Sequence, residues 1–293
     1  MTTQAIRPIK TVVQASKMME GAGVRIARTV GTAGLKNLDP FLMLDELKMP
    51  AHEASAGFPD HPHRGFETCS IMLTGRMEHK DSQGNHGVIQ DGGVQWMTAG
   101  RGIIHSEMPV VTPGAGMLHG FQLWVNLPAK DKMCKPRYQD IQAGEIPVAD
   151  KDGASVRVMA GSSLGVEGPI KMRNPGLLLD VRLAAGAQLD QHVPEEWNGF
   201  AYVYEGKGRI GDKAVEPQTA YVLHNEGDMV QATGGEGGLK FLLIAGKPIG
   251  EPIVQYGPFV MNSDAEIQQA FRDYQTGRLQ NPDDNPWKDD AEL

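Results

Sequence analysis

The chain has 293 residues, of which 40% are hydrophobic and 22% are charged, as in a soluble globular protein rather than a disordered tail. Its formal net charge of −8 argues against a broad phosphate-binding face, so direct nucleic-acid binding is not expected. The 2 cysteines are too few for a disulfide framework, and neither a secretory leader nor a membrane-spanning run is visible. We therefore expect an intracellular protein without membrane association, in the cytoplasm, or in the nucleus as well if the source is eukaryotic.

Short apolar runs separated by glycine recur along most of the chain and predict β-strands. The clearest are Thr68–Leu73, Gln122–Val125, Leu177–Leu183, Ala201–Tyr204 and Lys240–Ala245. A single helix is expected at Asp264–Tyr274, where apolar residues recur at helical spacing after a capping residue, Asn262 or Ser263.

The two halves of the chain follow a similar plan. A strand ends at Gly75 and a turn follows at Gly92, while Gly206 and Gly227 hold the matching places in the second half. This pattern indicates an internal duplication of a β-domain. We place the domains at residues 1–132 and 148–293, joined by a linker at 133–147, and expect a loosely packed tail from Asn281 to Leu293.

Two pairs of polar residues in the first half have the spacing of metal ligands. Alternate residues of a strand face the same side, so His61 and His63 share one face, as do His105 and Glu107. If the two strands are neighbours inside a barrel, three nitrogens and one oxygen converge. That donor set suits a borderline divalent metal.

Spacing alone leaves the metal open. Zinc would close the site with four ligands, whereas iron, manganese, cobalt or nickel would keep open positions for dioxygen and a substrate. In the second half, the places that correspond to the four ligands are held by His192, Pro194, Lys240 and Leu242. Three of the four donors are missing there, so we expect metal only in the first half.

Two long segments, Gly57–Glu67 and Gln95–Pro109, resemble the two signatures of the pirin family within the cupin superfamily. Shorter matches lie at Asn37–Phe41, Gln122–Asn126 and Gly257–Asn262. The resemblance implies an all-β bicupin, with two antiparallel β-sandwich barrels of jelly-roll type and a short C-terminal helix. It also implies a mononuclear iron in the N-terminal barrel and none in the C-terminal barrel.

The family's iron ligands carry over onto His61, His63, His105 and Glu107, which implies one Fe(II) per chain; nickel, manganese, cobalt and zinc remain alternatives. Glu67 stands where many other cupins have a ligand and is assigned a supporting role. Many pirins are similar to quercetinases, which open the flavonol ring with dioxygen and release carbon monoxide. We therefore predict a flavonol dioxygenase in which Glu107 also acts as the catalytic base, and a monomer.

Family members also include iron-dependent, redox-sensitive transcriptional co-regulators and modulators of metabolic enzymes. The alternative prediction is therefore a regulatory protein that acts through protein partners. Several other residues are assigned to packing or to the surface: Trp96, Trp124, Cys69, His79, His86 and His119. Arg64 and Arg101 flank the ligand pairs and are expected to hold strand ends through hydrogen bonds.

Overall fold

The computed structural model describes residues 5–112, 114 and 116–280, and the tail predicted from Asn281 to Leu293 lies outside these residues. The chain forms two compact units. The histidine unit consists of Lys17–Ala27, Phe41–Ala143 and Ile249–Leu293, and the second unit of Met1–Ser16, Arg28–Pro40 and Gly144–Pro248.

These units differ from the contiguous domains predicted at 1–132 and 148–293. The chain passes from the longest segment of the histidine unit to the longest segment of the second unit between Ala143 and Gly144, which lie inside the predicted linker at 133–147. Each unit also contains a segment from the opposite end of the chain. Local sequence patterns do not reveal such an exchange, because strand pairing between distant segments is decided by tertiary packing.

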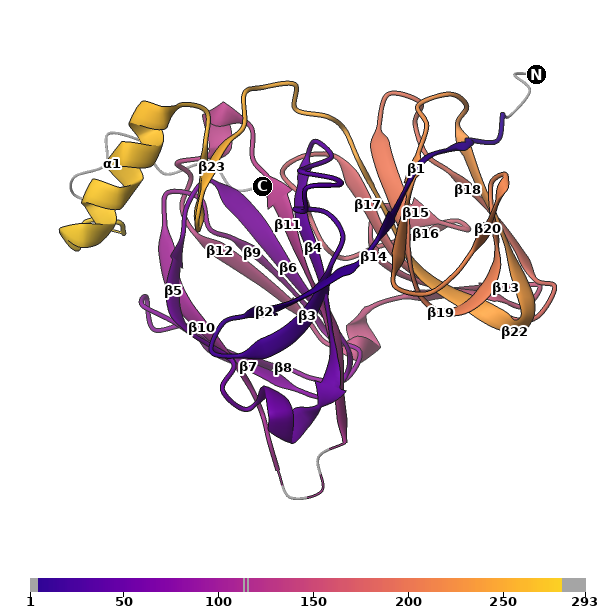
Figure 1. Ribbon diagram of the computed structural model, residues 1–293, viewed down its shortest axis with the longest axis horizontal. Coiled ribbons are helices and arrows are strands. Elements are labelled where there is room, and N and C mark those ends of the chain that lie inside the picture. Colours follow the sequence, from indigo (N-terminus) through magenta and orange to yellow (C-terminus); the bar gives the residue numbers. More distant parts are fainter. Residues whose placement is uncertain (1–4, 113, 115, 281–293) are drawn as a thin grey trace. The chain divides into compact units, whose positions relative to one another are not determined.

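The histidine unit is built from two antiparallel sheets, which Figure 1 shows in the indigo-to-magenta part of the chain. The larger sheet has the order β12-β9-β6-β11-β4-β3-β2. Its strands are β2 (Ser16–Glu20), β3 (Val24–Arg28), β4 (Phe41–Pro50), β6 (Phe66–Thr74), β9 (Val94–Thr98), β11 (Met117–Asn126) and β12 (Arg137–Ile141).

The smaller sheet has the order β5-β10-β7-β8. Its strands are β5 (Phe58–His63), β7 (Met77–Asp81), β8 (His86–Ile89) and β10 (Ile103–Pro109), and 3-10 turns lie at η1 (Ala51–Ala54) and η2 (Ala129–Asp131). Buried apolar residues from both sheets, such as Leu47, Met72, Met77 and Ile89, form one core cluster. The two sheets therefore pack face to face as a sandwich.

The histidine unit is completed by the end of the chain: β23 (Val254–Tyr256), β24 (Phe259–Met261) and α1 (Asp264–Gln275). The predicted helix is confirmed and begins after Ser263, whose hydroxyl accepts the backbone N–H of Glu266 at 3.4 Å. Ile267 and Ala270 of the helix pack in one buried cluster with Phe259, Met261 and Leu279.

The second unit has a nine-stranded antiparallel sheet that encloses its own apolar core. The main path is β1-β21-β19-β22-β17-β14-β13, with β18 paired to β22 and β20 paired to β19. The elements are β1 (Ile9–Gln14), η3 (Ala143–Glu145), β13 (Val148–Lys151), β14 (Ala154–Ala160), β15 (Ser162–Ser163), β16 (Val166–Glu167), β17 (Gly176–Leu183), β18 (Gln188–His192), β19 (Asn198–Ile210), β20 (Lys213–Val215), β21 (Thr219–Leu223) and β22 (Met229–Gly246).

Glycine allows the two longest strands of this sheet to bend. β19 shifts register against β22 between Gly206 and Gly208, and Gly206 has a φ of +79°. A Cβ at Gly206 would overlap the carbonyl oxygen of Gly238, so the two backbones approach more closely than any side chain allows.

The predicted all-β architecture with one C-terminal helix is confirmed, and each of the five predicted apolar runs lies inside a strand. In the described part of the chain, no helix has the length and apolar character needed to cross a membrane.

Candidate metal centre

The two predicted ligand pairs lie on neighbouring strands of the smaller sheet, β5 and β10 (Figure 1). His61 is the cross-strand partner of His105, and His63 is the partner of Ile103. Burial alternates along β10, with His105 and Glu107 on its buried face. The pairing therefore brings the histidines of both segments to one side of the sheet.

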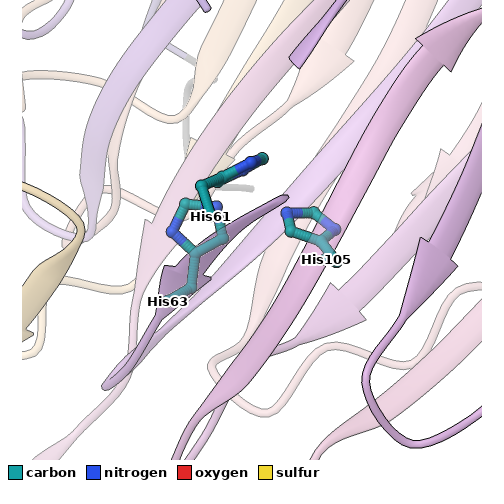
Figure 2. A group of neighbouring side chains, drawn as sticks. All are labelled: His61, His63 and His105. Atoms are coloured by element: carbon teal, nitrogen blue, oxygen red, sulfur yellow. The ribbon is translucent and has the colours of Figure 1, made fainter. Parts of the chain in front are cut away.

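The three imidazoles form one cluster. Their ring centroids are 4.5 Å apart for His61 and His105, 4.7 Å for His61 and His63, and 5.0 Å for His63 and His105. One nitrogen of each ring lies within 4.8 Å of one nitrogen of the other two. Figure 2 shows the rings gathered around a common space.

Burial keeps two of these rings in the neutral form that binds metals. His63 and His105 are only 2% and 1% exposed. Burial lowers the pKa of each imidazole well below its usual value, and the neighbouring histidines lower it further. Each ring therefore offers a lone pair at neutral pH.

Among the described residues, the ring nitrogens of His105 are buried without a hydrogen-bond partner, and those of His63 are buried with only the backbone of Pro258 as a polar neighbour. An unsatisfied buried polar atom costs about 1–3 kcal/mol. His61 differs, because its Nδ1 lies 2.8 Å from the carbonyl oxygen of Pro59. A proton on Nδ1 makes that hydrogen bond and leaves Nε2 as the donor atom toward a metal.

The residues present fit a divalent metal ion. Metal–nitrogen bonds to histidine are about 2.0–2.1 Å for zinc, so nitrogens this close to one another can share a single ion. Coordination would also satisfy one buried nitrogen of His63 and one of His105.

Glu107, the fourth predicted ligand, lies on the same face of β10 but outside the cluster formed by the three histidines. Its Oε1 is 2.9 Å from the hydroxyl of Ser70, and its Oε2 accepts a hydrogen bond of 3.2 Å from the side-chain amide of Gln122. The hydroxyl of Ser70 also lies 2.6 Å from Oε1 of Gln122, so its one proton serves two acceptors. These contacts hold the carboxylate beside the histidines.

Two aromatic side chains, Trp124 and Phe66, lie beside the cluster and are called the aromatic wall below. The ring of Trp124 stands edge-on to His63 with centroids 5.2 Å apart, and it lies against Phe66 at 4.4 Å. The sequence assigned Trp124 to core packing, and its partly buried side chain does pack against a buried cluster that includes Phe66, while its ring also borders His63. The signal was available, because Gln122 and Trp124 alternate on one strand and both reach the site.

His79 is a second residue whose place the sequence left open. It is buried, pairs across the strands with Glu107, and lies 3.3 Å from Oδ2 of Asp140 through its Nε2. Asp140 also accepts a hydrogen bond from Gln95. His86, by contrast, is an exposed partner of Glu78.

Glu67 lies on the opposite face of β6 from Phe66 and Ser70, because successive residues of a strand alternate. It is buried, and its Oε1 accepts a hydrogen bond from Thr98 at 2.7 Å. This position agrees with a supporting role rather than a ligand. Cys69 is fully buried, and burial raises the pKa of its thiol, as expected for a small hydrophobe.

The corresponding places in the second unit have other partners. His192 is exposed and faces Asp228, with 3.6 Å between Nε2 and Oδ2. Lys240 pairs with Glu205 at 2.7 Å, and Leu242 is fully buried.

Comparison with known proteins places relatives along nearly the whole chain. A family model described as Pirin matches residues 23–125, and one described as the Pirin C-terminal cupin domain matches residues 178–280. A pirin-like protein of Solanum lycopersicum is 48% identical over 262 residues, which cover 88% of each chain. The pirin of Homo sapiens is 46% identical over 265 residues, which cover 88% of this chain and 89% of that protein.

A solved structure has the same architecture. It is a quercetin 2,3-dioxygenase from Acinetobacter baumannii, 35% identical, with a TM-score of 0.85. The superposition covers 94% of this chain and 99% of that one.

Proposed function

The chain belongs to the pirin family, with the bicupin fold predicted for it, and on that premise we propose that it is a mononuclear metal-dependent dioxygenase. Its substrate would be a flavonol such as quercetin, opened with dioxygen and with release of carbon monoxide. The observation that carries the proposal is the group of three converging histidines beside a hydrogen-bonded carboxylate. The likeness to a quercetin 2,3-dioxygenase over almost the whole of both chains supports the choice of substrate.

In this proposal His61, His63, His105 and Glu107 would hold one Fe(II). The bound ion would supply Lewis acidity toward a substrate oxygen and redox chemistry with dioxygen. Each imidazole is a neutral ligand and the carboxylate carries one negative charge, so a divalent site keeps one positive charge. That residual charge favours an anionic substrate oxygen.

Glu107 is the residue that would accept the proton of the flavonol hydroxyl. Both of its carboxylate oxygens are oriented by hydrogen bonds, one from Ser70 and one from Gln122. A base held in position loses little freedom on reaction. Trp124, which is partly buried and backed by the buried ring of Phe66, would offer an apolar aromatic ring beside His63 on which the planar flavonol could rest.

Anaerobic reconstitution with Fe(II), followed by addition of quercetin and oxygen, tests the proposal. The expected result is consumption of quercetin with one carbon monoxide released per turnover. Nickel, manganese and cobalt are tested in parallel, and zinc serves as the closed-shell comparison. Absence of turnover with every metal would overturn the dioxygenase and leave a metal-dependent regulatory protein as the reading of the same site.

A further inference from the structure

β5 carries two of the three clustered histidines, yet it is weakly held by its own sheet. It lies at the edge of the sheet, and among the described residues β10 is the one strand that pairs with it. Pro59 and Pro62 have no backbone N–H to donate, and the register slips between His105 and Glu107. The position of His61 and His63 therefore depends on contacts beyond the strand pairing.

Those contacts converge on Arg64, the residue after His63. Its side chain is 3% exposed and donates three hydrogen bonds. Nε donates to the carbonyl of Arg101, which precedes β10. Nη1 donates to Oδ2 of Asp273 in α1 at 2.7 Å, and Nη2 donates to the carbonyl of Leu279 at 3.2 Å. One guanidinium thus joins both histidine-bearing segments to the end of the chain.

The backbone makes the same connection. The N–H of Val260 donates to the carbonyl of Arg64 at 3.0 Å, and Arg64 pairs with Phe259 in a parallel bridge. At Gly65, where φ is +89°, a Cβ would overlap the carbonyl oxygen of Val260. At Gly102, just before β10, a Cβ would come within 2.6 Å of the side chain of Leu279. Glycine at both places lets the end of the chain lie directly against the ligand segments.

Lys132 also joins the segment that follows β5 to the end of the chain, through hydrogen bonds made in the buried interior. Its side chain is almost fully buried, and Nζ donates to the carbonyls of Gly65 at 2.7 Å and Val260 at 3.0 Å and to Oδ1 of Asn126 at 2.6 Å. Three segments far apart in sequence are therefore bound to one ammonium group.

We infer that residues 258–280, the C-terminal segment, help to position the ligands of the metal centre. Arg64 is the positioning residue through which this segment sets the place of His63 relative to His105. The inference rests on the proposed metal site. The segment falls within the match to the C-terminal cupin model, yet it belongs to the histidine unit. The sequence of one cupin thus completes the ligand geometry of the other.

The test measures metal binding rather than turnover. Full-length metal-free protein is titrated with Ni²⁺ by calorimetry, and the absorption spectrum of the Co²⁺-loaded protein reports ligand geometry. Asp273→Asn removes the carboxylate that pairs with Arg64. Asp264→Asn makes the same chemical change at an exposed position of the same helix and is the matched control.

Asp273→Asn is expected to weaken Ni²⁺ binding by up to about tenfold, because Asp273 acts through Arg64 and loss of a direct hydrogen-bond partner of a ligand costs about 10- to 100-fold; the Co²⁺ spectrum should also change. Asp264→Asn should match the wild type, and Asp273→Glu, which keeps the carboxylate, should restore most of the affinity. Arg64→Lys keeps the positive charge but loses the planar guanidinium with its several N–H donors, so it should also weaken Ni²⁺ binding. This variant tests the inference even if Asp273→Asn fails to fold.

Wild-type affinity and an unchanged spectrum in folded Asp273→Asn and Arg64→Lys would overturn the positioning role while leaving the site intact. If the wild-type protein bound neither Ni²⁺ nor Co²⁺, the metal site itself would be wrong, and the inference with it.

Discussion

The hydroxyl of Ser70 on β6 lies 2.9 Å from Oε1 of Glu107 on β10, so a hydrogen bond connects the two sheets of the histidine unit beside the imidazole cluster. Gln122 on β11 donates to the other carboxylate oxygen. Glu107 and the histidines all belong to the smaller sheet, but the hydrogen bonds that orient the carboxylate come from the larger one. The relative position of the two sheets therefore determines how the carboxylate faces the three imidazoles.

Replacing the carboxylate tests its chemical role. In Glu107→Gln, kcat for quercetin should fall about 10²- to 10⁴-fold, because a positioned base typically contributes that much. Stopped-flow rates and metal content are measured together, with the exposed Glu53→Gln as control. Full turnover with metal bound would contradict the base role, and loss of metal would identify Glu107 as an essential ligand.

The buried imidazoles predict how stability depends on pH. The pKa values of His63 and His105 are lowered in the folded state, so below about pH 6.5 the unfolded chain takes up protons that the folded chain does not. The metal-free protein should therefore be fully stable above about pH 6.5. It should lose about 1.4 kcal/mol per buried histidine for each pH unit below that value.

Urea unfolding of the metal-free protein at pH 7.5 and 5.5 measures this loss. His63→Gln should reduce the difference between the two pH values, whereas His86→Gln, at an exposed position, should not. An equal pH dependence in all three proteins would show that the buried rings do not determine it.

Substitution of Trp124 in the aromatic wall should change the binding of quercetin without changing the metal content. Trp124→Ala should raise KM for quercetin about tenfold or more, because it removes a stacking partner and its buried area. Trp124→Phe keeps an aromatic face and should change KM less. Metal content is measured in both variants, and an unchanged KM in Trp124→Ala would exclude this wall as the substrate surface.

Two glycines allow a matched test of the close approach at the C-terminal segment. Gly65 and Gly84 have φ values of +89° and +87°, but a Cβ at Gly84 would meet nothing within 4 Å. Gly84→Ala should cost about 1–2 kcal/mol of unfolding free energy from backbone strain alone. Gly65→Ala should cost clearly more, because its Cβ meets the carbonyl of Val260. Equal losses in chemical denaturation would mean that the two backbones can separate freely.

Much of the candidate metal site could be predicted from local sequence pattern. Strand alternation placed the two members of each pair on one face, and the pairing of His61 with His105 brings the segments together. Glu107 is the exception: it shares the buried face of β10 but lies outside the histidine cluster. Its hydrogen bonds come from β6 and β11, strands whose position relative to β10 no local pattern specifies.

The sequence by itself determined the all-β character, the positions of the main strands and helix, and the three histidines that the fold brings together as a candidate metal centre. These features follow from the period of apolar residues and from short spacings, which act over a few residues. Only the tertiary structure decided that the end of the chain belongs to the histidine unit and that Arg64 joins it to both ligand segments. The bond from Arg64 to Asp273 spans 209 residues, and such a contact arises from packing rather than from any local preference.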